Sequence, residues 1–191
     1  MENNIIKEIK SDGVIIVKIN IRYPVSGNDI IDRYILRIVN ALERFAEKKL
    51  FMRALREKEE TKNFVPLSLV ATYKSVMKNE NFFSFWFDVF VWESGSVRRV
   101  KRIPLNFDQR ASSIIFPLEK YHRRELMGVL DVSVSKICAS GHFYADCTKL
   151  ARKYFKKTNA VITPKGIFAT YDSGILAPHE RGAVNIFLFR T

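Results

Sequence analysis

FFSFWFDVFVW, residues Phe82 to Trp92, is the most apolar stretch of this sequence and decides its fold. Its odd-numbered residues form one face of a strand, because side chains alternate across a strand with a period of two. Trp86, Phe90 and Trp92 form the other face. A strand that is apolar on both faces is typical of the covered centre of a sheet. A base-stacking surface is the alternative, but no Lys or Arg is interleaved, which favours a core strand.

Further strands are expected on both sides of this run. Gly13–Tyr23 alternates polar and apolar residues, which predicts a strand with one buried face. The other expected strands lie at Pro66–Ser75, Val97–Phe107, Ala160–Thr163, Ile167–Tyr171 and Gly182–Phe189.

Three helices are expected between the strands. Asn28 or Asp29 can cap the first, whose apolar residues recur at spacings of four and three. These residues are Ile31, Ile35, Ile38, Leu42 and Phe45. The charge-rich stretch from Arg53 to Lys62 is expected to be a solvated helix end or a linker. Tyr121–Cys138 and His142–Lys156 are expected to form a helix pair.

This order of elements predicts an α+β fold, with antiparallel sheets packed against a long N-terminal helix and a C-terminal helix pair. Residues 1–60 and 64–191 are expected to be two regions of one compact unit. With 191 residues, of which 47% are apolar, the chain has enough apolar surface to fold without a cofactor. The three histidines lie far apart in the sequence, so no metal site is expected.

The charge balance points to an acidic partner. Lys and Arg number 32 against 20 Asp and Glu, a net charge of +12, and such a field attracts phosphates and acidic protein surfaces. One basic cluster comprises Arg98, Arg99, Lys101 and Arg102. A second comprises Lys149, Arg152, Lys153, Lys156 and Lys157. The second cluster makes a nucleic-acid-associated protein the first alternative, although a solvated helix face is the simpler interpretation because no nucleic-acid-binding motif accompanies it.

The two cysteines and the first ten residues indicate the cellular compartment of the protein. Met1–Lys10 lacks the apolar stretch of a secretory signal, so the sequence as written predicts a cytoplasmic protein, or an extracellular one if it was trimmed from a precursor. Cys138 and Cys147 are too few for a disulfide framework and agree with a reducing compartment. With His142 between them they make a thiol-dependent enzyme the second alternative, although Cys147 is placed like a buried thiol.

The segment from Asp172 to Arg181 is the best candidate for a recognition edge. It joins two expected strands, and a loop held at both ends loses less entropy on binding than a floppy one. The candidate ligand-binding residues are Tyr171, Pro178, His179 and Arg181, together with Arg98, Arg99, Lys101 and Arg102. The simpler interpretation is that Pro178 only shapes a turn before the last strand.

Several segments resemble a known family. ITPKGI at Ile162–Ile167 and YDSGILAPHERGAV at Tyr171–Val184 resemble the end of the DUF3298 domain. LNFD at Leu105–Asp108 is similar to a strand of the same domain, and YPVSGN at Tyr23–Asn28 is similar to the start of the companion DUF4163 region. The sequence has His179 where the family has a tyrosine.

The resemblance implies an α+β recognition domain without catalysis of its own. Members of the family usually face the cell exterior in Gram-positive bacteria. Some are the sensing regions of lysozyme-responsive anti-sigma factors, and others accompany polysaccharide deacetylase domains. The leading interpretation is therefore a non-enzymatic binding or sensing module that recognises an acidic or polymeric partner.

Overall fold

The computed structural model describes residues 1–93, 96–139 and 141–190, with the backbone alone for residues 96–99. The chain divides into two compact units, Met1–Tyr73 with Val89–Arg99 and Lys74–Asp88 with Val100–Thr191. The first sheet has the order β1 (Glu2–Ser11), β2 (Val14–Pro24), β3 (Leu67–Lys78), β4 (Phe82–Glu93), β5 (Ser96–Asp108) and β6 (Ser113–Ile114). The second has the order β7 (Ala160–Thr163), β8 (Gly166–Tyr171) and β9 (Val184–Phe189). The predicted α+β class is confirmed.

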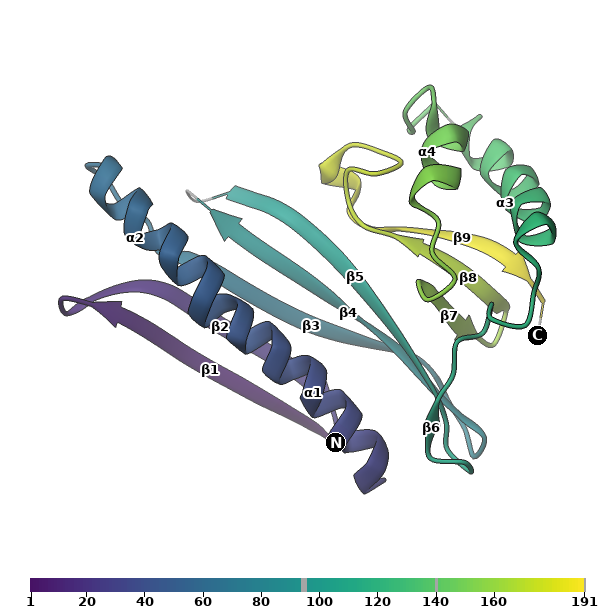
Figure 1. Ribbon diagram of the computed structural model, residues 1–191, viewed down its shortest axis with the longest axis horizontal. Coiled ribbons are helices and arrows are strands. Elements are labelled where there is room, and N and C mark those ends of the chain that lie inside the picture. The colour runs from purple at the N-terminus through teal and green to yellow at the C-terminus, as the bar shows by residue number, and fades with distance from the viewer. Residues whose placement is uncertain (94–95, 140, 191) are drawn as a thin grey trace. The chain divides into compact units, whose positions relative to one another are not determined.

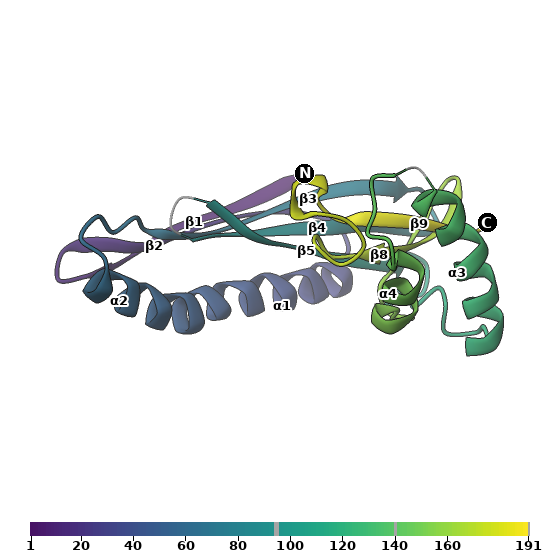
Figure 2. The same ribbon diagram turned by 90° about the horizontal axis from the view of Figure 1, so that it is seen from above.

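One continuous helical segment covers a face of the first unit's strands (Figures 1 and 2). It comprises α1 (Asp29–Phe45), the π-helical turn η1 (Ala46–Leu50) and α2 (Phe51–Glu60). The Asn28 side chain accepts hydrogen bonds from the backbone N–H groups of Ile30 and Ile31, at 3.0 and 3.3 Å. The predicted cap is therefore present, and it satisfies two donors that have no partner within the helix.

The buried stripe of this helix differs from the predicted one. Its buried residues are Ile31, Ile35, Val39, Ala46, Leu50 and Ala54. Phe45, expected in the stripe, is 43% exposed. Residues four apart drift around an α-helix by about 40° per step, and the wider π turn offsets this drift. The turn η1 thereby keeps Leu50 and Ala54 on the sheet side.

The first sheet is mixed, so the prediction of purely antiparallel pairing is wrong here. β2 pairs with β3 in parallel, with Val17 opposite Leu67 and Ile21 opposite Ala71. The reason is the intervening helix, which carries the chain back to the end of the sheet where β2 began.

Strand β1 was not predicted from the sequence. It forms a hairpin with β2 through Asp12 and Gly13, whose φ angles are 52° and 77°. Positive φ at both positions is typical of the two-residue turn that Asp-Gly favours. That dipeptide was the signal that could have revealed the hairpin.

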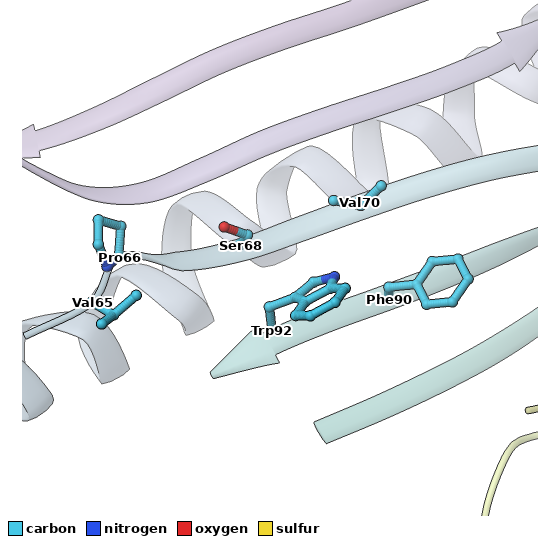
Figure 3. Close-up of a pocket in the computed structure, with 6 residues that line it drawn as sticks. All are labelled: Val65, Pro66, Ser68, Val70, Phe90 and Trp92. Atoms are coloured by element: carbon cyan, nitrogen blue, oxygen red, sulfur yellow. The ribbon is translucent and has the colours of Figure 1, made fainter. Parts of the chain in front are cut away.

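The aromatic strand β4 lies at the centre of the packing, as predicted. Phe83, Phe85 and Phe87 are at most 2% exposed, and the rings of the first two lie 6.5 and 6.3 Å from that of Phe107 on β5. The opposite face of β4 was also predicted to be covered, but it is covered only in part, because Trp92 is 40% exposed. Its side chain projects from the face of the sheet that α1 and α2 do not cover (Figure 3).

In the second unit, α3 (Arg123–Cys138) and α4 (Cys147–Tyr154) pack with the β7–β9 sheet around one apolar core. The core includes Leu118, Leu126, Leu130, Ala151 and Ile186. Helix α4 is shorter than the predicted His142–Lys156, so Lys156 and Lys157 follow the helix. In the described part of the chain, no helix has the length and apolar character needed to cross a membrane.

A buried asparagine joins β5 to β7. The Asn106 side chain is 3% exposed, donates to the carbonyl of Ala160 at 2.8 Å and accepts from the N–H of Ile162 at 2.8 Å. The two bonds satisfy backbone groups at the edge of β7 that would otherwise be buried without partners, which is costly.

Replacing Asn106 by Ala should therefore lower the free energy of unfolding by about 2 to 5 kcal/mol, because two buried backbone groups lose their partner. Urea unfolding followed by circular dichroism measures this change. Asn63→Ala is the control, since Asn63 is exposed. Equal stabilities of the two variants would contradict the structural role of Asn106.

Candidate functional site

The first residues of the turn after β8 are hydrogen-bonded to β5. The Ser173 N–H donates to the carbonyl of Val100 at 3.0 Å, and the Ser173 hydroxyl accepts from the Val100 N–H at 3.0 Å. The Asp172 carboxylate accepts from the N–H of Arg102 at 2.9 Å. The start of the predicted recognition edge is thus held by backbone groups of a strand.

The exposed part of the edge is also ordered. Leu176 and Ala177 are buried, and Pro178 then leads into a short 3-10 helix, η2 (His179–Arg181), whose residues are exposed. The Arg181 guanidinium lies over the ring of Phe143, 5.2 Å from its centroid. The edge therefore exposes Pro178, His179 and Arg181 in a fixed conformation. Glu180 is its acidic residue.

His179 and Ser173 lie within hydrogen-bond distance of each other, and Ser173 also contacts the backbone of β5. His179 Nδ1 is 3.2 Å from Ser173 Oγ. Ser173 is 6% exposed, and its hydroxyl also accepts from the Val100 N–H and lies 3.2 Å from the Val100 carbonyl. The Ser173 hydroxyl is thus engaged with the backbone of Val100 as well as with the His179 ring.

Tyr171 does not belong to the exposed edge, contrary to the prediction. It is 2% exposed and donates its hydroxyl to the carbonyl of Ala151 at 3.1 Å. Burial strongly raises the pKa of the phenol, because the charged form cannot be solvated there. Tyr171 lies on the face of β8 that packs into the apolar core of the second unit.

Arg102 is held by its neighbours. Its guanidinium makes two hydrogen bonds of 2.7 Å with Asp88 and one of 3.0 Å with Asn185. It also lies over the indole of Trp86, 4.4 Å from the ring centroid. Lys101, next in the chain, is exposed. Arg102 is therefore structural, and Lys101 is the accessible cation at this point.

Arg98 and Arg99 belong to β5, but their side chains lie outside the described residues.

The second basic cluster is divided between different environments. Arg152 forms an ion pair with Asp131, which lowers the pKa of that carboxyl group. Lys157 donates to the carbonyl of Tyr121 at 2.6 Å. Lys149, Lys153 and Lys156 are exposed. The predicted stripe thus consists of three exposed lysines and of Arg152, which is exposed but paired with Asp131. A nucleic-acid role stays a prediction.

The cysteines are joined in a disulfide, Cys138 to Cys147, between the end of α3 and the start of α4. The expectation of free thiols is therefore wrong, and neither sulfur is available as a nucleophile in this state. The spacing of the two cysteines in the sequence did not predict their disulfide. The disulfide can form because α4 runs antiparallel to α3, which brings the end of α3 close to the start of α4.

An apolar groove that was not predicted from the sequence lies on the first unit's sheet (Figure 3). Val65, Pro66, Ser68 and Val70 line it from β3 and the residues before it, and Phe90 and Trp92 line it from β4. The alternation within β4 places both aromatic residues away from the buried face. The signal was present in the sequence, but both faces of β4 were assigned to the core.

Replacing Arg102 by Ala should lower the free energy of unfolding by about 3 kcal/mol, because Asp88 keeps a partly buried charge without its cation. Lys101→Ala is the matched control and should change stability by less than about 0.5 kcal/mol. Chemical denaturation of the two variants measures the difference. A larger loss for Lys101→Ala would contradict these assignments.

The comparisons with known proteins give a structural match. No family model matches the sequence, and no curated protein matches it. A DUF3298 family protein from Pseudomonas aeruginosa aligns with a TM-score of 0.66 and 11% identity, over 98% of this chain and 89% of that one. A DUF3298 family member from Bacteroides fragilis aligns with a TM-score of 0.62 and 12% identity, over the same shares of the two chains. The chain therefore has the fold of the DUF3298 family proteins along nearly its whole length.

Proposed function

We propose that the protein is a non-enzymatic binding module that recognises an acidic partner through the edge formed by Pro178–Arg181. The observation that carries the proposal is the fixed frame of this exposed turn. Ser173 fastens its start to Val100, buried Leu176 anchors its middle, and Arg181 rests on Phe143. A preordered loop binds with a smaller loss of conformational entropy than a mobile one.

Charge supports an acidic partner. The net charge of +12 steers anionic molecules to the protein over long distances. At the edge itself, Arg181 offers guanidinium N–H donors, and Lys101 is exposed between two residues that bond to Asp172 and Ser173. Arginine fits carboxylates because it can donate two parallel hydrogen bonds.

The arrangement of the polar residues supports binding without catalysis. Ser173 is engaged with the backbone of Val100, and both cysteines are in a disulfide. Among the residues that the structure describes, no three His, Cys, Asp or Glu side chains gather in a way that could hold a metal ion. We therefore propose recognition rather than chemistry at the edge.

The test replaces His179 and Arg181 together by Ala and measures binding to poly-L-glutamate by fluorescence anisotropy at low salt. We expect affinity to fall by about five- to tenfold, or roughly 1 to 1.4 kcal/mol, which is the net contribution of an ordinary hydrogen bond. Thermal unfolding checks that the variant is folded.

The matched control replaces His122 and Arg123 by Ala, an exposed pair of the same types in the same unit. It removes the same formal charge and should leave the affinity within about twofold. Equal weakening by both pairs would mean that net charge alone attracts the polymer, and the edge would lose its assigned role.

We also propose that the protein works in an oxidising compartment. Of the two locations expected from the sequence, the Cys138–Cys147 disulfide favours the extracellular one over the cytoplasm. Disulfides persist in secreted and periplasmic proteins and are rare where glutathione keeps thiols reduced.

Protein purified from its native compartment without reductant should carry no titratable thiol. Alkylation under denaturing conditions followed by mass spectrometry measures this, with a sample reduced beforehand as the control that takes up two labels. Two labels on the unreduced native protein would show free thiols and refute the proposed location.

A further inference from the structure

The groove of the first unit exposes apolar side chains that a folded chain normally covers. Val65 is 49% exposed and Trp92 is 40% exposed, and Phe90 and Val70 between them are only partly buried (Figure 3). Contiguous apolar surface of this kind marks interaction sites, and tryptophan is enriched among residues that dominate binding energy.

Cations flank the groove on the neighbouring strand. Lys18 of β2 stands in register with Ser68 of β3, so both side chains are on the groove face, and Arg22 shares that face because it is four residues further along β2. Lys18 and Arg22 are exposed. Glu8 and Glu2 of β1, in register with Lys18 and Pro24, are acids one strand further from the groove. The strand next to the groove therefore presents two cations and no acid on this face.

The backbone beneath the groove limits what can bind. β3 lies between β2 and β4, and β4 lies between β3 and β5. Their backbone groups are therefore directed at neighbouring strands, so a ligand cannot add to the sheet as another strand. It must bind through side chains that fill the groove.

The dimensions fit a short helix. Val65 to Val70 spans about 17 Å of extended chain, which equals about three turns of an α-helix. The other face of the same strands is covered by the amphipathic helix α1–α2, which buries Ile31, Ile35 and Val39. An apolar sheet face is covered in this way in two-layer folds.

We propose that this groove binds an acidic amphipathic helix of a partner protein, with its apolar side chains between Val65 and Trp92 and its carboxylates toward Lys18 and Arg22. This site is separate from the Pro178–Arg181 edge and does not depend on the function proposed for that edge. Binding would cover Trp92, and the surrounding rim would exclude water from the contact.

The test uses Trp92 as the reporter. The probe is a synthetic peptide about 15 residues long, with Leu at helical spacing on one face and Glu on the other. Two peptides serve as comparisons: a scrambled one of the same composition, and one with Lys in place of Glu. We expect the acidic amphipathic peptide to shift the tryptophan emission to shorter wavelength, and the other two to bind at least about tenfold more weakly.

Variants locate the site. Trp92→Ala and Val65→Asp should each weaken binding by at least about tenfold, as measured by calorimetry. Met52→Ala is the matched control, because Met52 is 53% exposed on α2 of the same unit. Trp92→Phe should abolish the emission shift while binding persists. Replacing Lys18 and Arg22 by Glu should reverse the preference between the acidic and the basic peptide.

The proposal would be overturned by no binding of the acidic peptide, by equal binding of the scrambled peptide, or by equal losses in Met52→Ala and Trp92→Ala. A proline-rich peptide that binds more tightly than the acidic helix would replace the proposed partner class and likewise refute it.

Discussion

The fold of the second unit depends on side chains that form hydrogen bonds with backbone groups. These bonds take the place of those that a neighbouring strand would supply. Ser173 bonds to both the N–H and the carbonyl of Val100, and Asn106 bonds to the N–H of Ile162 and the carbonyl of Ala160. A buried backbone group without a partner costs as much as a lost hydrogen bond, so these positions tolerate few other residues. The same bonds fix the start of the turn that carries the proposed recognition edge. Its exposed residues can vary because its frame is held elsewhere.

This constraint explains what the family resemblance consists of. Asn106 belongs to the LNFD segment, and Ser173 and Gly174 belong to the YDSGIL segment. Gly174 has a φ of 76°, and a Cβ there would lie 2.4 Å from the His179 ring. Gly166 of the ITPKGI segment has a φ of 135°, and a Cβ there would lie 1.9 Å from the carbonyl oxygen of Phe189. The recognisable segments are therefore those that hold the strands and turns in place. The two similar structures share the fold at 11 and 12% identity.

Local physical rules predicted the elements well and their environments less well. The cap at Asn28 and the aromatic strand β4 follow from neighbouring residues, and both are present. Whether one face of a strand is covered depends on elements far away in the sequence, which is why Trp92 was assigned to the core. Tyr171 was assigned to the recognition edge because the alternation of side chains along β8 does not reveal which face of the strand packs against the helices. The disulfide required the path of α4 relative to α3, which no spacing of two cysteines encodes.

We infer that side-chain hydrogen bonds to the backbone hold β5, β7 and the turn after β8 as one cooperative unit. Native-state amide hydrogen exchange of Ile162 and Val100 measures this cooperativity, because their N–H groups donate to Asn106 and Ser173. Both amides should exchange only through global unfolding, with the same free energy as the amides of β4. Exchange as fast as that of the exposed Glu180 amide in η2 would contradict it.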